Sequence, residues 1–563
     1  MSERIFIGVA WPYADGPLHL GHIAGAYLPA DIFARYHRTK GNEVLMVSGS
    51  DQHGTPITIK AEQEGKKPSE IASKYHQQFL DSWQKLGISF DLFTSTGTVN
   101  HAEVTQDIFR TLYNKDKIYK DTVSQALCPQ CQRFLPDRYL EGTCPYCNSA
   151  GARGDQCDAC GKPLNTAELI APRCRICGTT PIFKDSEHFF LKLSDFQGKL
   201  LDWVKDKKHW RPNVLNFTMR YLEEGLRDRA ITRDIEWGVP VPIDGFENKR
   251  IYVWFEAVIG YLSAAKEWAK SSGDEEKWRS FWQGDVNDVK SYYFIGKDNI
   301  LFHTIVWPAM LIGYNDDLNL PYDVPANEFL TIEGRKLSTS HNWAVWLPDY
   351  LSRYDPDPLR YLLSINMPET GDTDFSWREF VRRNNNELVA TYGNLVHRVL
   401  TFVYRNFDGC VPEYRTIDDS GVVLDNKAKA IETLVDSLLS QCHFKQAIMQ
   451  AMLLAQETNR YLDEKSPWKV IKEDRQAAAN SLFTAICTIS RLKNILYPFL
   501  PFSSQKVHEY LGFEGHIEEY TRKNPLQSLP PPGQRLREPK PLFSKLDEGL
   551  VEEETSRVGL PGS

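Results

Sequence analysis

The sequence has little of several features that mark other classes of protein. No apolar run approaches the roughly 20 residues that a membrane-spanning helix requires, so we expect no such span. The first ten residues lack the long apolar core and small-residue cleavage site of a secretory signal, and we expect a cytoplasmic protein. An excess of positive charge is also missing, since 66 Lys and Arg stand against 74 Asp and Glu. This balance excludes a generally cationic coat protein, but it leaves room for a tRNA binder with a local basic face.

Cysteine is scarce over most of the chain and concentrated in one stretch. Of the 11 cysteines, Cys410, Cys442 and Cys487 stand alone, and we expect them to be small core residues. The others form four Cys-x-x-Cys pairs, at 128/131, 144/147, 157/160 and 174/177. Chance clustering is the weaker explanation. Without an export signal, such pairs are typical of metal ligands rather than disulfides. Because four thiolates make one tetrahedral zinc site, we predict two structural zinc ions.

The spacing leaves two ways of pairing the cysteines. The two inner pairs are close enough to form a compact knuckle, which the outer pairs would flank. We therefore favour nested sites, with consecutive pairing as the alternative. The nested ligand sets are Cys144, Cys147, Cys157 and Cys160 for the first zinc, and Cys128, Cys131, Cys174 and Cys177 for the second. Sites saturated with thiolate leave no position for water, so their role is structural.

The remaining sequence predicts a multidomain α/β protein followed by helices. With 563 residues, 42% hydrophobic and 25% charged, we expect roughly three or four globular domains. Apolar strands at 5–10 and 44–48 flank a helical pattern at 21–38, which is the unit of a doubly wound parallel sheet. Residues 120–190 lose this pattern and are interpreted as an insertion. Strands are expected again at 250–255 and 291–295.

From about Phe375 onward the apolar spacing is helical and predicts an all-α bundle. Two apolar stripes illustrate it, one from Phe444 to Ala455 and one from Ile486 to Leu496. Near the end, 529–533 predicts a stiff proline linker, and 552–563 is expected to be frayed.

A histidine pair lies where the first strand turns into the first helix. His19, Gly21 and His22 stand at the carboxyl edge of the predicted sheet, where ligands bind in such folds. Two imidazoles at a helix N-terminus can face an anion, and the helix end adds free N–H groups. Taken alone, the pair could equally be a helix cap and a packed histidine.

A polar loop far along the chain supplies a second motif, Glu333–Ser340, of sequence EGRKLSTS. Adjacent cations and hydroxyls can close over a polyphosphate, although any solvated basic loop has a similar composition. With the histidine pair, in this order and on this fold pattern, the loop resembles the second nucleotide-binding signature of class I aminoacyl-tRNA synthetases.

Further segments narrow the resemblance to the methionyl-tRNA synthetase family, over nearly the whole chain. They are Ala10–Gly16, Asp51–Pro56, Asp185–Phe190, Tyr252–Ala257, Phe294–Asp298, Phe302–His303 and Trp307–Met310. The resemblance implies a Rossmann-type doubly wound sheet with a zinc-binding insertion, followed by a helical bundle. The implied division is catalytic domain at 1–118 and 227–320, zinc insertion at 119–226, stem-contact region at 321–380, anticodon-binding bundle at 381–535 and tail at 536–563.

The resemblance also implies the reaction and its partners. Methionine and ATP would give methionyl-adenylate and pyrophosphate, and the methionyl group would pass to the 3′-terminal adenosine of tRNA(Met). Magnesium would accompany ATP. The implied ATP-binding residues are His19, Gly21, His22, Lys297, Asp298, Lys336, Ser338 and Thr339, of which His19, His22, Lys336 and Thr339 are catalytic candidates.

Methionine recognition is implied for a separate set of residues. Asp51 matches the acid that holds the substrate ammonium. The pocket residues are Trp11, Tyr13, Trp254, Ala257, Tyr261 and His303. A thioether packs well against such aromatic faces, with sulfur–ring contacts of ~0.3–1.5 kcal/mol. Taken singly, Trp254 and Tyr261 are more simply explained as core residues. Val258 stands where family members often have Pro, which leaves the shape of that wall open.

Anticodon recognition is implied for Asn394, Arg398 and Trp468. Asn394 and Arg398 are four residues apart and share one helix face. Trp468 can stack on an unpaired base, although a tryptophan capping a bundle is the plainer interpretation without the family. Arg378, Arg382 and Arg383 add local positive charge.

Two other functions compete with a methionine–tRNA ligase. A zinc-dependent RNA-binding protein without catalysis would explain the cysteines but not the nucleotide motifs. A synthetase for another hydrophobic amino acid usually carries a large editing insertion, for which this chain has little room. No appended C-terminal domain of the OB-fold type is recognised, and we expect a monomer.

The second motif departs from its family. Most class I synthetases have Lys-Met-Ser-Lys-Ser, whereas this chain has Lys336-Leu337-Ser338-Thr339-Ser340. Leu for Met is a tolerated apolar exchange, but Thr339 removes a cation. Loss of activity, a hydroxyl donor at Thr339 and a nearby cation are the three explanations. We favour local replacement, with Thr339 as a donor beside Arg335 and Lys336, and His341 as a lesser candidate.

Overall fold

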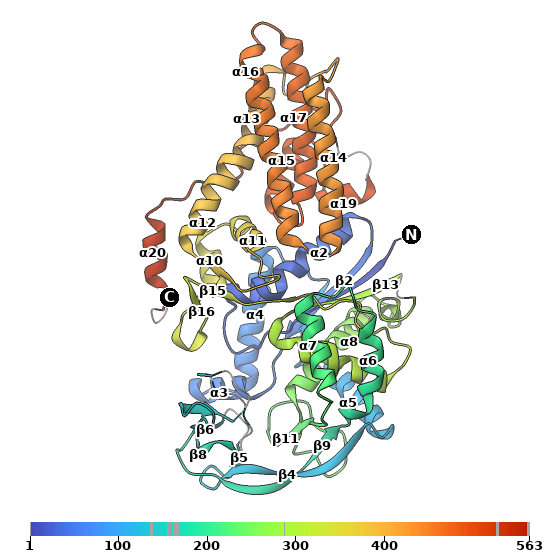
Figure 1. Ribbon diagram of the computed structural model, residues 1–563, viewed down its shortest axis with the longest axis vertical. Coiled ribbons are helices and arrows are strands. Elements are labelled where there is room, and N and C mark those ends of the chain that lie inside the picture. The colour runs from blue at the N-terminus through green and yellow to red at the C-terminus, as the bar shows by residue number, and fades with distance from the viewer. Residues whose placement is uncertain are drawn as a thin grey trace.

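The computed structural model describes residues 2–135, 139–154, 157, 159–160, 164, 168–285, 288–524 and 529–559. The molecule is elongated, with three parts along its length (Figure 1). A helical bundle stands at one end, a layer of antiparallel strands at the other, and an α/β domain between them.

A five-stranded parallel sheet forms the centre of the α/β domain. Its order is β14-β13-β1-β2-β3, with β1 spanning Arg4–Val9, β2 Glu43–Ser50, β3 Leu92–Ser95, β13 Val289–Gly296 and β14 Ala326–Asn327. Ile7 of β1 is paired with Met46 on one side and Tyr292 on the other. The strands are apolar and buried because helices cover both faces of the sheet. Since β13 follows the insertion and pairs with β1, the sheet resumes after it as predicted.

The crossover after β1 is one continuous helical run. It comprises α1 (Leu20–His22), a π-helical turn (Ile23–Tyr27) and α2 (Leu28–Thr39). The helices that follow up to the end of the α/β domain are α3 (Thr55–Glu64), α4 (Pro68–Leu86), α5 (Val99–Asn114), α8 (Val253–Ser271) and α9 (Trp307–Tyr314). Gly65 and Gly87 end α3 and α4 in the left-handed conformation, which is the usual helix stop.

The insertion leaves the sheet on a long antiparallel ribbon. β4 (Ile118–Cys128) pairs with β9 (Ile182–Leu191), from Ile118 opposite Leu191 to Leu127 opposite Ile182. At the far end of the ribbon lie the short strands β5 (Arg133–Phe134), β6 (Leu140–Thr143), β7 (Ala150–Arg153) and β8 (Ile170–Cys174). The chain leads back toward the sheet through helices α6 (Gln197–Lys205) and α7 (Pro212–Glu223) and the short strands β10 (Arg229–Ala230), β11 (Thr232–Arg233) and β12 (Arg250–Ile251). Strand β10 pairs with β9, and β11 pairs with β12.

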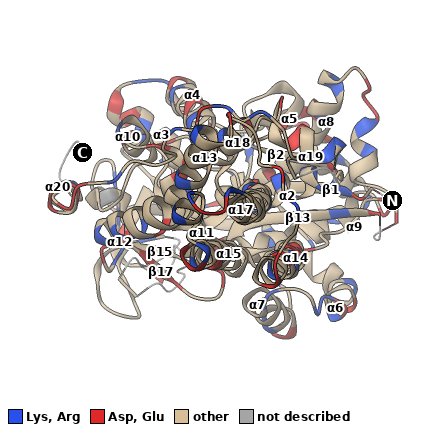
Figure 2. Cartoon of the chain, turned by 90° about the horizontal axis from the view of Figure 1, so that it is seen from above, with Lys and Arg blue, Asp and Glu red and all other residues tan. Residues whose placement is uncertain are grey.

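A small module connects the α/β domain to the bundle. It contains β15 (Leu330–Ile332), β16 (Arg335–Lys336), β17 (Thr373–Phe375), α10 (Leu347–Arg353) and α11 (Pro356–Ile365). The bundle follows with α12 (Trp377–Arg383), a π-helical stretch (Asn384–Gly393), α13 (Asn394–Asn406), α14 (Asp419–Ser440), α15 (Phe444–Lys465), α16 (Pro467–Val470), α17 (Arg475–Leu496), α18 (Pro501–Tyr510) and α19 (Ile517–Lys523). Both predicted apolar stripes are buried, which confirms the predicted all-α domain. Seen from above, α14, α15 and α17 stand over the middle of the molecule (Figure 2).

Two local expectations are wrong. Strand structure at 250–255 stops at Ile251, because Tyr252 is the N-cap of the long helix α8, which begins at Val253 and whose apolar residues pack on the sheet. The terminal segment expected to be frayed contains α20 (Leu550–Arg557), which packs beside α12 (Figure 1). Glu554 of α20 is buried and forms an ion pair with Arg353 and a 2.7 Å hydrogen bond from the Tyr354 hydroxyl.

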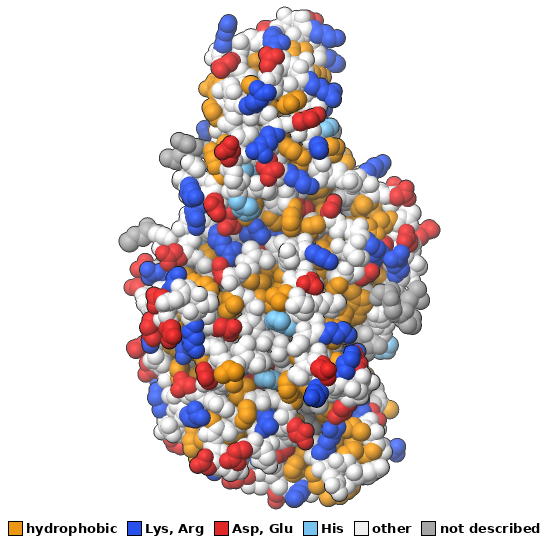
Figure 3. Space-filling view, turned by 180° about the vertical axis from the view of Figure 1, so that it is seen from behind, with side chains coloured by type: hydrophobic (Ala, Val, Ile, Leu, Met, Phe, Trp, Pro, Cys, Tyr) orange, Lys and Arg blue, Asp and Glu red, His pale blue; other side chains and the backbone are white. Residues whose placement is uncertain are grey.

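The described helices include none that is long and apolar enough to cross a membrane. Acidic and basic side chains are interleaved over the face seen in Figure 3, as expected from the composition. Of the lone cysteines, Cys442 and Cys487 are buried as predicted, and Cys410 is partly buried.

Candidate active site and its associated sites

A cavity of about 560 Å³ opens at the carboxyl edge of β1 and β13. Parallel sheets place their ligand sites at this edge, because loops diverge there. The predicted site residues that line the cavity are Trp11, Tyr13, His19, Gly21, His22, Asp51, Trp254, Ala257, Tyr261, Asp298, His303 and Lys336. Residues that are hundreds of positions apart in the sequence therefore meet in one hollow.

His19 and His22 stack at one end of this cavity, with ring centroids 3.7 Å apart. The His19 backbone N–H donates to His22 Nδ1 at 3.2 Å, so the ring proton of a neutral His22 lies on Nε2. Burial lowers the pKa of His22 to about 4, and burial together with His22 holds the pKa of His19 well below its usual value. Both rings are thus neutral hydrogen-bond donors at pH 7. His19 Nδ1 is buried without a partner among the described residues, as expected of a group awaiting a ligand.

The histidine segment is hydrogen-bonded to the chain that follows the second motif. Leu20 N donates to Val345 O at 3.1 Å, and Leu347 N donates to Leu18 O at 2.7 Å. These bonds form a short bridge between His19 and Trp346. Two motifs that lie far apart in the sequence are therefore fixed side by side by main-chain bonds.

The second motif forms a tight hairpin. Ile332 pairs with Arg335, so Glu333 and Gly334 make a two-residue turn with φ of 49° and 73°. Both positions need the left-handed conformation, which is why a glycine stands in this turn. Asp374 accepts from Gly334 N at 2.8 Å and anchors the turn. The hairpin thereby directs Lys336 toward the cavity, which that residue lines.

Three predicted nucleotide residues do not line the cavity. Lys297 forms ion pairs with Glu328 at 2.7 Å and with Asp372 at 2.9 Å. Thr339 is exposed at the start of a 3-10 turn, and the Ser338 hydroxyl lies 2.9 Å from His341 Nδ1. The structure therefore brings Lys336 to the cavity but leaves Lys297, Ser338 and Thr339 beside it.

Asp51 presents a carboxylate in a buried setting. It follows β2 and lines the cavity, and its Oδ1 accepts from His53 N at 3.2 Å. Burial, reinforced by the nearby Glu256 carboxylate, raises the pKa of Asp51 well above its usual value. His53 Nδ1 lies 2.7 Å from Glu256 Oε1. A buried acid with a raised pKa gains most from a cationic ligand, such as a substrate ammonium.

Aromatic rings form one wall of the cavity. Trp254 stacks on Phe302 at 5.0 Å, and Tyr13 meets Trp254 edge-on at 5.9 Å. Trp11 lies against Gly260, where any Cβ would stand 2.7 Å from the indole ring. Gly260 is therefore required for the position of Trp11. The wall offers a flat apolar surface to a flexible side chain.

Tyr261 and His303 form a fixed polar pair within this wall. Geometry at His303 favours an Nδ1–H that donates to Asn299 O at 2.8 Å, so its Nε2 accepts from the Tyr261 hydroxyl at 2.7 Å. Burial lowers the pKa of His303 to about 4 and keeps the ring neutral. Both side chains are buried, and the Tyr261 hydroxyl proton and the His303 ring proton are each already used in a hydrogen bond. This wall therefore has a defined hydrogen-bonding pattern.

Several residues that line the cavity were not predicted as site residues. Tyr27, Phe302, Glu328, Phe329 and Leu337 are the main ones. Phe302 was quoted only as part of a family segment, and its spacing to Trp254 carried no local signal. Tyr27 lies five residues after His22, which in a regular α-helix would place it on another side; the π-helical turn at Ile23–Tyr27 brings it back, and α-helical periodicity does not predict that turn.

The cysteines form two groups. Cys128, Cys131, Cys174 and Cys177 make one, and Cys144, Cys147, Cys157 and Cys160 the other, with the sulfur atoms of each group within 4.8 Å of one another. The sulfur atoms are therefore grouped in the nested arrangement that the spacing favours. Sulfur atoms at such distances suit a tetrahedral metal ion.

The predicted anticodon residues gather on the side of the bundle. Asn394 begins α13 and is exposed, and Arg398 lies one turn later. The Arg398 guanidinium is 4.2 Å from the ring centroid of Trp468, and it also approaches Asp463 at 3.6 Å. Trp468 is partly buried and meets Phe402 edge-on. One face of the indole is thus covered by Arg398, which a stacking base would have to share or displace.

Comparison with protein families defines the class first. The family described as "tRNA synthetases class I (M)" matches residues 5–400. A second, "Anticodon binding domain of methionyl tRNA ligase", matches residues 411–560. Together with the cavity at the carboxyl edge of the sheet, these matches place the protein among the class I aminoacyl-tRNA synthetases.

Within that class the chain belongs to the methionyl-tRNA synthetase family. A relative from Dehalococcoides mccartyi strain CBDB1, named methionine–tRNA ligase, is 63% identical over 560 residues and the alignment covers 100% of both chains. A methionine–tRNA ligase from Thermomicrobium roseum is 52% identical over 582 residues, with 99% of each chain covered. The family predicted from the motifs is therefore confirmed.

Solved structures agree in fold. Mycobacterium tuberculosis methionyl-tRNA synthetase in complex with methionyl-adenylate has a TM-score of 0.80 at 24% identity, covering 96% of this chain and 99% of that one. Its apo form has a TM-score of 0.72 at 23% identity, covering 97% and 98%. The predicted Rossmann-type sheet followed by a helical domain is thereby confirmed.

The raised pKa of Asp51 predicts how methionine use depends on pH. Below that pKa the carboxyl is neutral and cannot attract an ammonium, so kcat/KM for methionine should fall as the pH is lowered through it. Pyrophosphate exchange measured as a function of pH would show this fall. The corresponding value for ATP should stay flat above about pH 5, because the pKa of His22 is about 4. A flat methionine profile would contradict the assignment of Asp51.

Proposed function

We propose that this chain is a methionine–tRNA ligase that uses the cavity for both of its steps. Methionine attacks the α-phosphate of ATP to give methionyl-adenylate and pyrophosphate. The methionyl group then passes to the 3′-terminal adenosine of tRNA(Met), for protein synthesis. The carrying observation is that nucleotide-type donors and an amino-acid pocket face one hollow of about 560 Å³.

The nucleotide side uses neutral donors and one cation. His22 Nε2–H and the unpartnered His19 ring face the triphosphate, and Lys336 approaches from the hairpin. Fixed donors of this kind stabilise charge that develops on departing pyrophosphate. Asp298 and Glu328 line the same region, and carboxylate oxygens suit the Mg²⁺ that accompanies ATP. Gly21 lies beside His19 and keeps the backbone close to the ligand.

The amino-acid side is built around Asp51 and the aromatic wall. The Asp51 carboxylate holds the substrate ammonium, and the side chain of methionine packs between Trp254, Tyr13 and Tyr261. Trp11, Ala257 and His303 complete the pocket. The Tyr261 hydroxyl proton is used in the bond to His303, so the methionine thioether contacts the Tyr261 ring rather than a hydrogen-bond donor.

The zinc groups and the bundle have supporting roles. The two Cys₄ sets would each hold a structural zinc that organises the end of the β4–β9 ribbon, since a thiolate-saturated ion has no open position. Asn394, Arg398 and Trp468 read the anticodon. The domain boundaries given above, a monomeric state and a cytoplasmic location belong to the same proposal.

The reaction is tested by ATP–pyrophosphate exchange with a panel of amino acids. Methionine alone should support exchange at low concentration. Leucine, isoleucine and valine should fail, because their side chains have no sulfur to contact the aromatic rings and therefore bind the pocket less well. Exchange with leucine or valine at methionine-like efficiency would favour another synthetase, and no exchange with any of them would favour a non-catalytic RNA binder.

Metal content and its pairing can be predicted together. Purified without chelator, the protein should hold two zinc ions. Replacing Cys128 and Cys174 together by Ser should leave one ion, because both belong to one group. Replacing Cys128 and Cys144 together should leave none. Atomic absorption measures both, and the reverse pattern would establish consecutive pairing.

Lys336 should dominate over Thr339. Lys336→Ala should lower the pyrophosphate-exchange rate by ~100-fold or more, since a fixed donor to the leaving group is lost. Thr339→Ala should cost ~10-fold or less, because Thr339 is exposed and does not line the cavity. The rates are compared at saturating methionine. Equal losses in the two variants would contradict the assignment of the main role to Lys336.

Trp468 should act on tRNA alone. Trp468→Ala should lower tRNA charging by ~10-fold or more through ~1–3 kcal/mol of lost stacking. Methionine-dependent pyrophosphate exchange should stay near that of the unaltered protein, since Trp468 lies in the bundle and the cavity in the α/β domain. An equal fall in both activities would make Trp468 a structural residue.

A further inference from the structure

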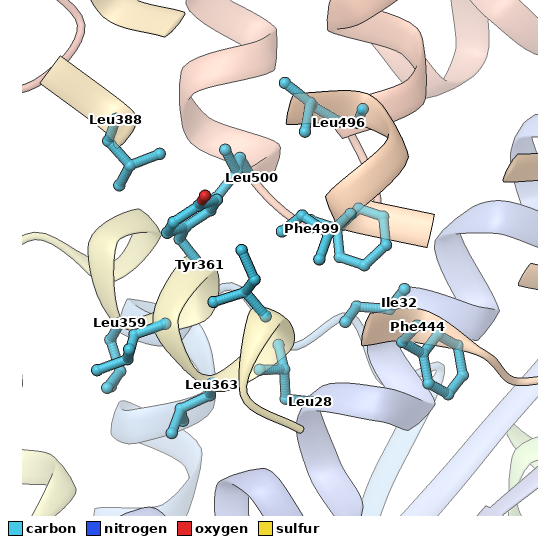
Figure 4. Packing of buried hydrophobic residues seen from close by; sticks show 14 of the residues in the cluster. Leu28, Ile32, Leu359, Tyr361, Leu363, Leu388, Phe444, Leu496, Phe499 and Leu500 are labelled. Atoms are coloured by element: carbon cyan, nitrogen blue, oxygen red, sulfur yellow. The ribbon is translucent and has the colours of Figure 1, made fainter. Parts of the chain in front are cut away.

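The catalytic domain and the bundle meet at a joint formed by α2, α11 and the chain from the end of α17 to the start of α18. Its apolar part is one cluster, in which Leu28 and Ile32 of α2 lie with Leu359 and Leu363 of α11 and with Leu496, Phe499 and Leu500 of the bundle (Figure 4). These side chains are buried. Apolar contacts of this kind hold the parts together but tolerate small sliding, because they are not directional.

A charged group lies inside this apolar joint. Asp31 of α2 is fully buried and bonds Arg35 Nε at 2.9 Å and Arg360 Nη2 of α11 at 2.7 Å. Ser89 donates to the other carboxylate oxygen from its N–H and its hydroxyl, at 2.8 and 2.6 Å. Although burial by itself raises the pKa of Asp31, the two guanidinium groups and Ser89 outweigh it and lower that pKa to about 2.

The two arginines connect Asp31 to the bundle through hydrogen bonds. Arg360 donates to Phe499 O at 2.8 Å and to Pro498 O at 2.9 Å, in the link between α17 and α18. Arg35 donates to the Tyr497 hydroxyl at 2.7 Å, and Tyr497 in turn donates to Glu518 of α19 at 2.9 Å. Bonds to main-chain carbonyls at buried sites are strongly directional. The cluster therefore fixes both the distance and the angle between the parts.

Each nucleotide motif is connected to this cluster by a short rigid element. Asp31 lies twelve positions after His19 on one uninterrupted helical run, which is about 18 Å at 1.5 Å per residue. Arg360 lies on α11, which follows the hairpin of Lys336 through α10. A change in the joint would thus shift the bundle relative to His19 and Lys336 together.

Stability alone does not account for such a group. Buried ion pairs contribute little net stability compared with apolar residues of similar size, and their best-attested use is to specify register. The remaining joint is already apolar and well buried. The directional bonds are therefore better explained by the position they impose than by the energy they add.

We propose that Asp31, Arg35, Arg360 and Tyr497 are positioning residues that set the orientation of the bundle relative to the cavity, so that aminoacyl transfer to tRNA depends on them and adenylate formation does not. The inference rests on the proposed function. A tRNA bound by its anticodon must place its 3′ end in the cavity, and a small angular error at the joint is magnified along the length of the tRNA.

The test compares two activities of full-length variants. Arg360→Met removes the bonds to Phe499, Pro498 and Asp31 but leaves Asp31 paired with Arg35 and Ser89. Tyr497→Phe removes only the hydroxyl between Arg35 and Glu518. Arg279→Met, at an exposed arginine that takes part in none of these bonds, is the control for loss of an arginine. Pyrophosphate exchange and charging of tRNA(Met) are measured for each, together with thermal unfolding.

For Arg360→Met, charging should fall by about 10-fold or more while exchange stays within about twofold, as expected when misplacement rather than chemistry limits the rate. Tyr497→Phe should also lower charging more than exchange, but by a smaller factor. In both, discrimination between tRNA(Met) and a tRNA with an altered anticodon should shrink, which a purely structural role would not cause. The control should change neither activity.

Equal loss of exchange and charging, or a charging rate unchanged in both variants, would overturn the proposal. If Arg360→Met fails to fold, Tyr497→Phe decides, since it keeps every charge of the cluster. Failure of the unaltered protein to exchange pyrophosphate with methionine would refute the proposed function instead, so the two failures are distinguishable.

Discussion

Main-chain hydrogen bonds between residues 18–20 and 345–347 are the constraint on which the site depends. They join the histidine helix to the hairpin module, and no side chain takes part in them. The position of the second motif is therefore set by the backbone and by the Glu333–Gly334 turn, and not by the side chain at position 339.

The ionisable groups around the cavity differ in state as well as in position. His19, His22 and His303 are held neutral by burial, whereas Asp51 is an acid whose charged form is disfavoured until a cation arrives. The free site thus carries little fixed charge apart from Lys336 and the acids near it. Such a cavity binds its substrates through many directed donors and acceptors, and the local field changes most when both substrates are present.

Most of the residues that the sequence motifs predicted for the site do line the cavity, because the motifs combine residue type with position on an element. His19 and His22 at a helix start, and Asp51 at a strand end, were predicted and do line the cavity. Phe302 and Tyr27 were missed because their role depends on tertiary packing. The strand expected over 250–255 became a helix since the apolar face of α8 has a sheet to cover. Likewise α20 is ordered through contacts with Arg353 and Tyr354, which local composition does not reveal.

The ribbon of β4 and β9 has a consequence for how this chain can vary. Ile118 and Leu191, where the ribbon leaves the α/β domain, are paired neighbours. Once β4 and β9 have paired, the length of the chain between them adds no loop-closure entropy cost to the formation of the central sheet. The Cys₄ groups can therefore be gained, shortened or lost in evolution without disturbing the register of β1 and β13. The metal-binding unit can vary independently of the α/β domain.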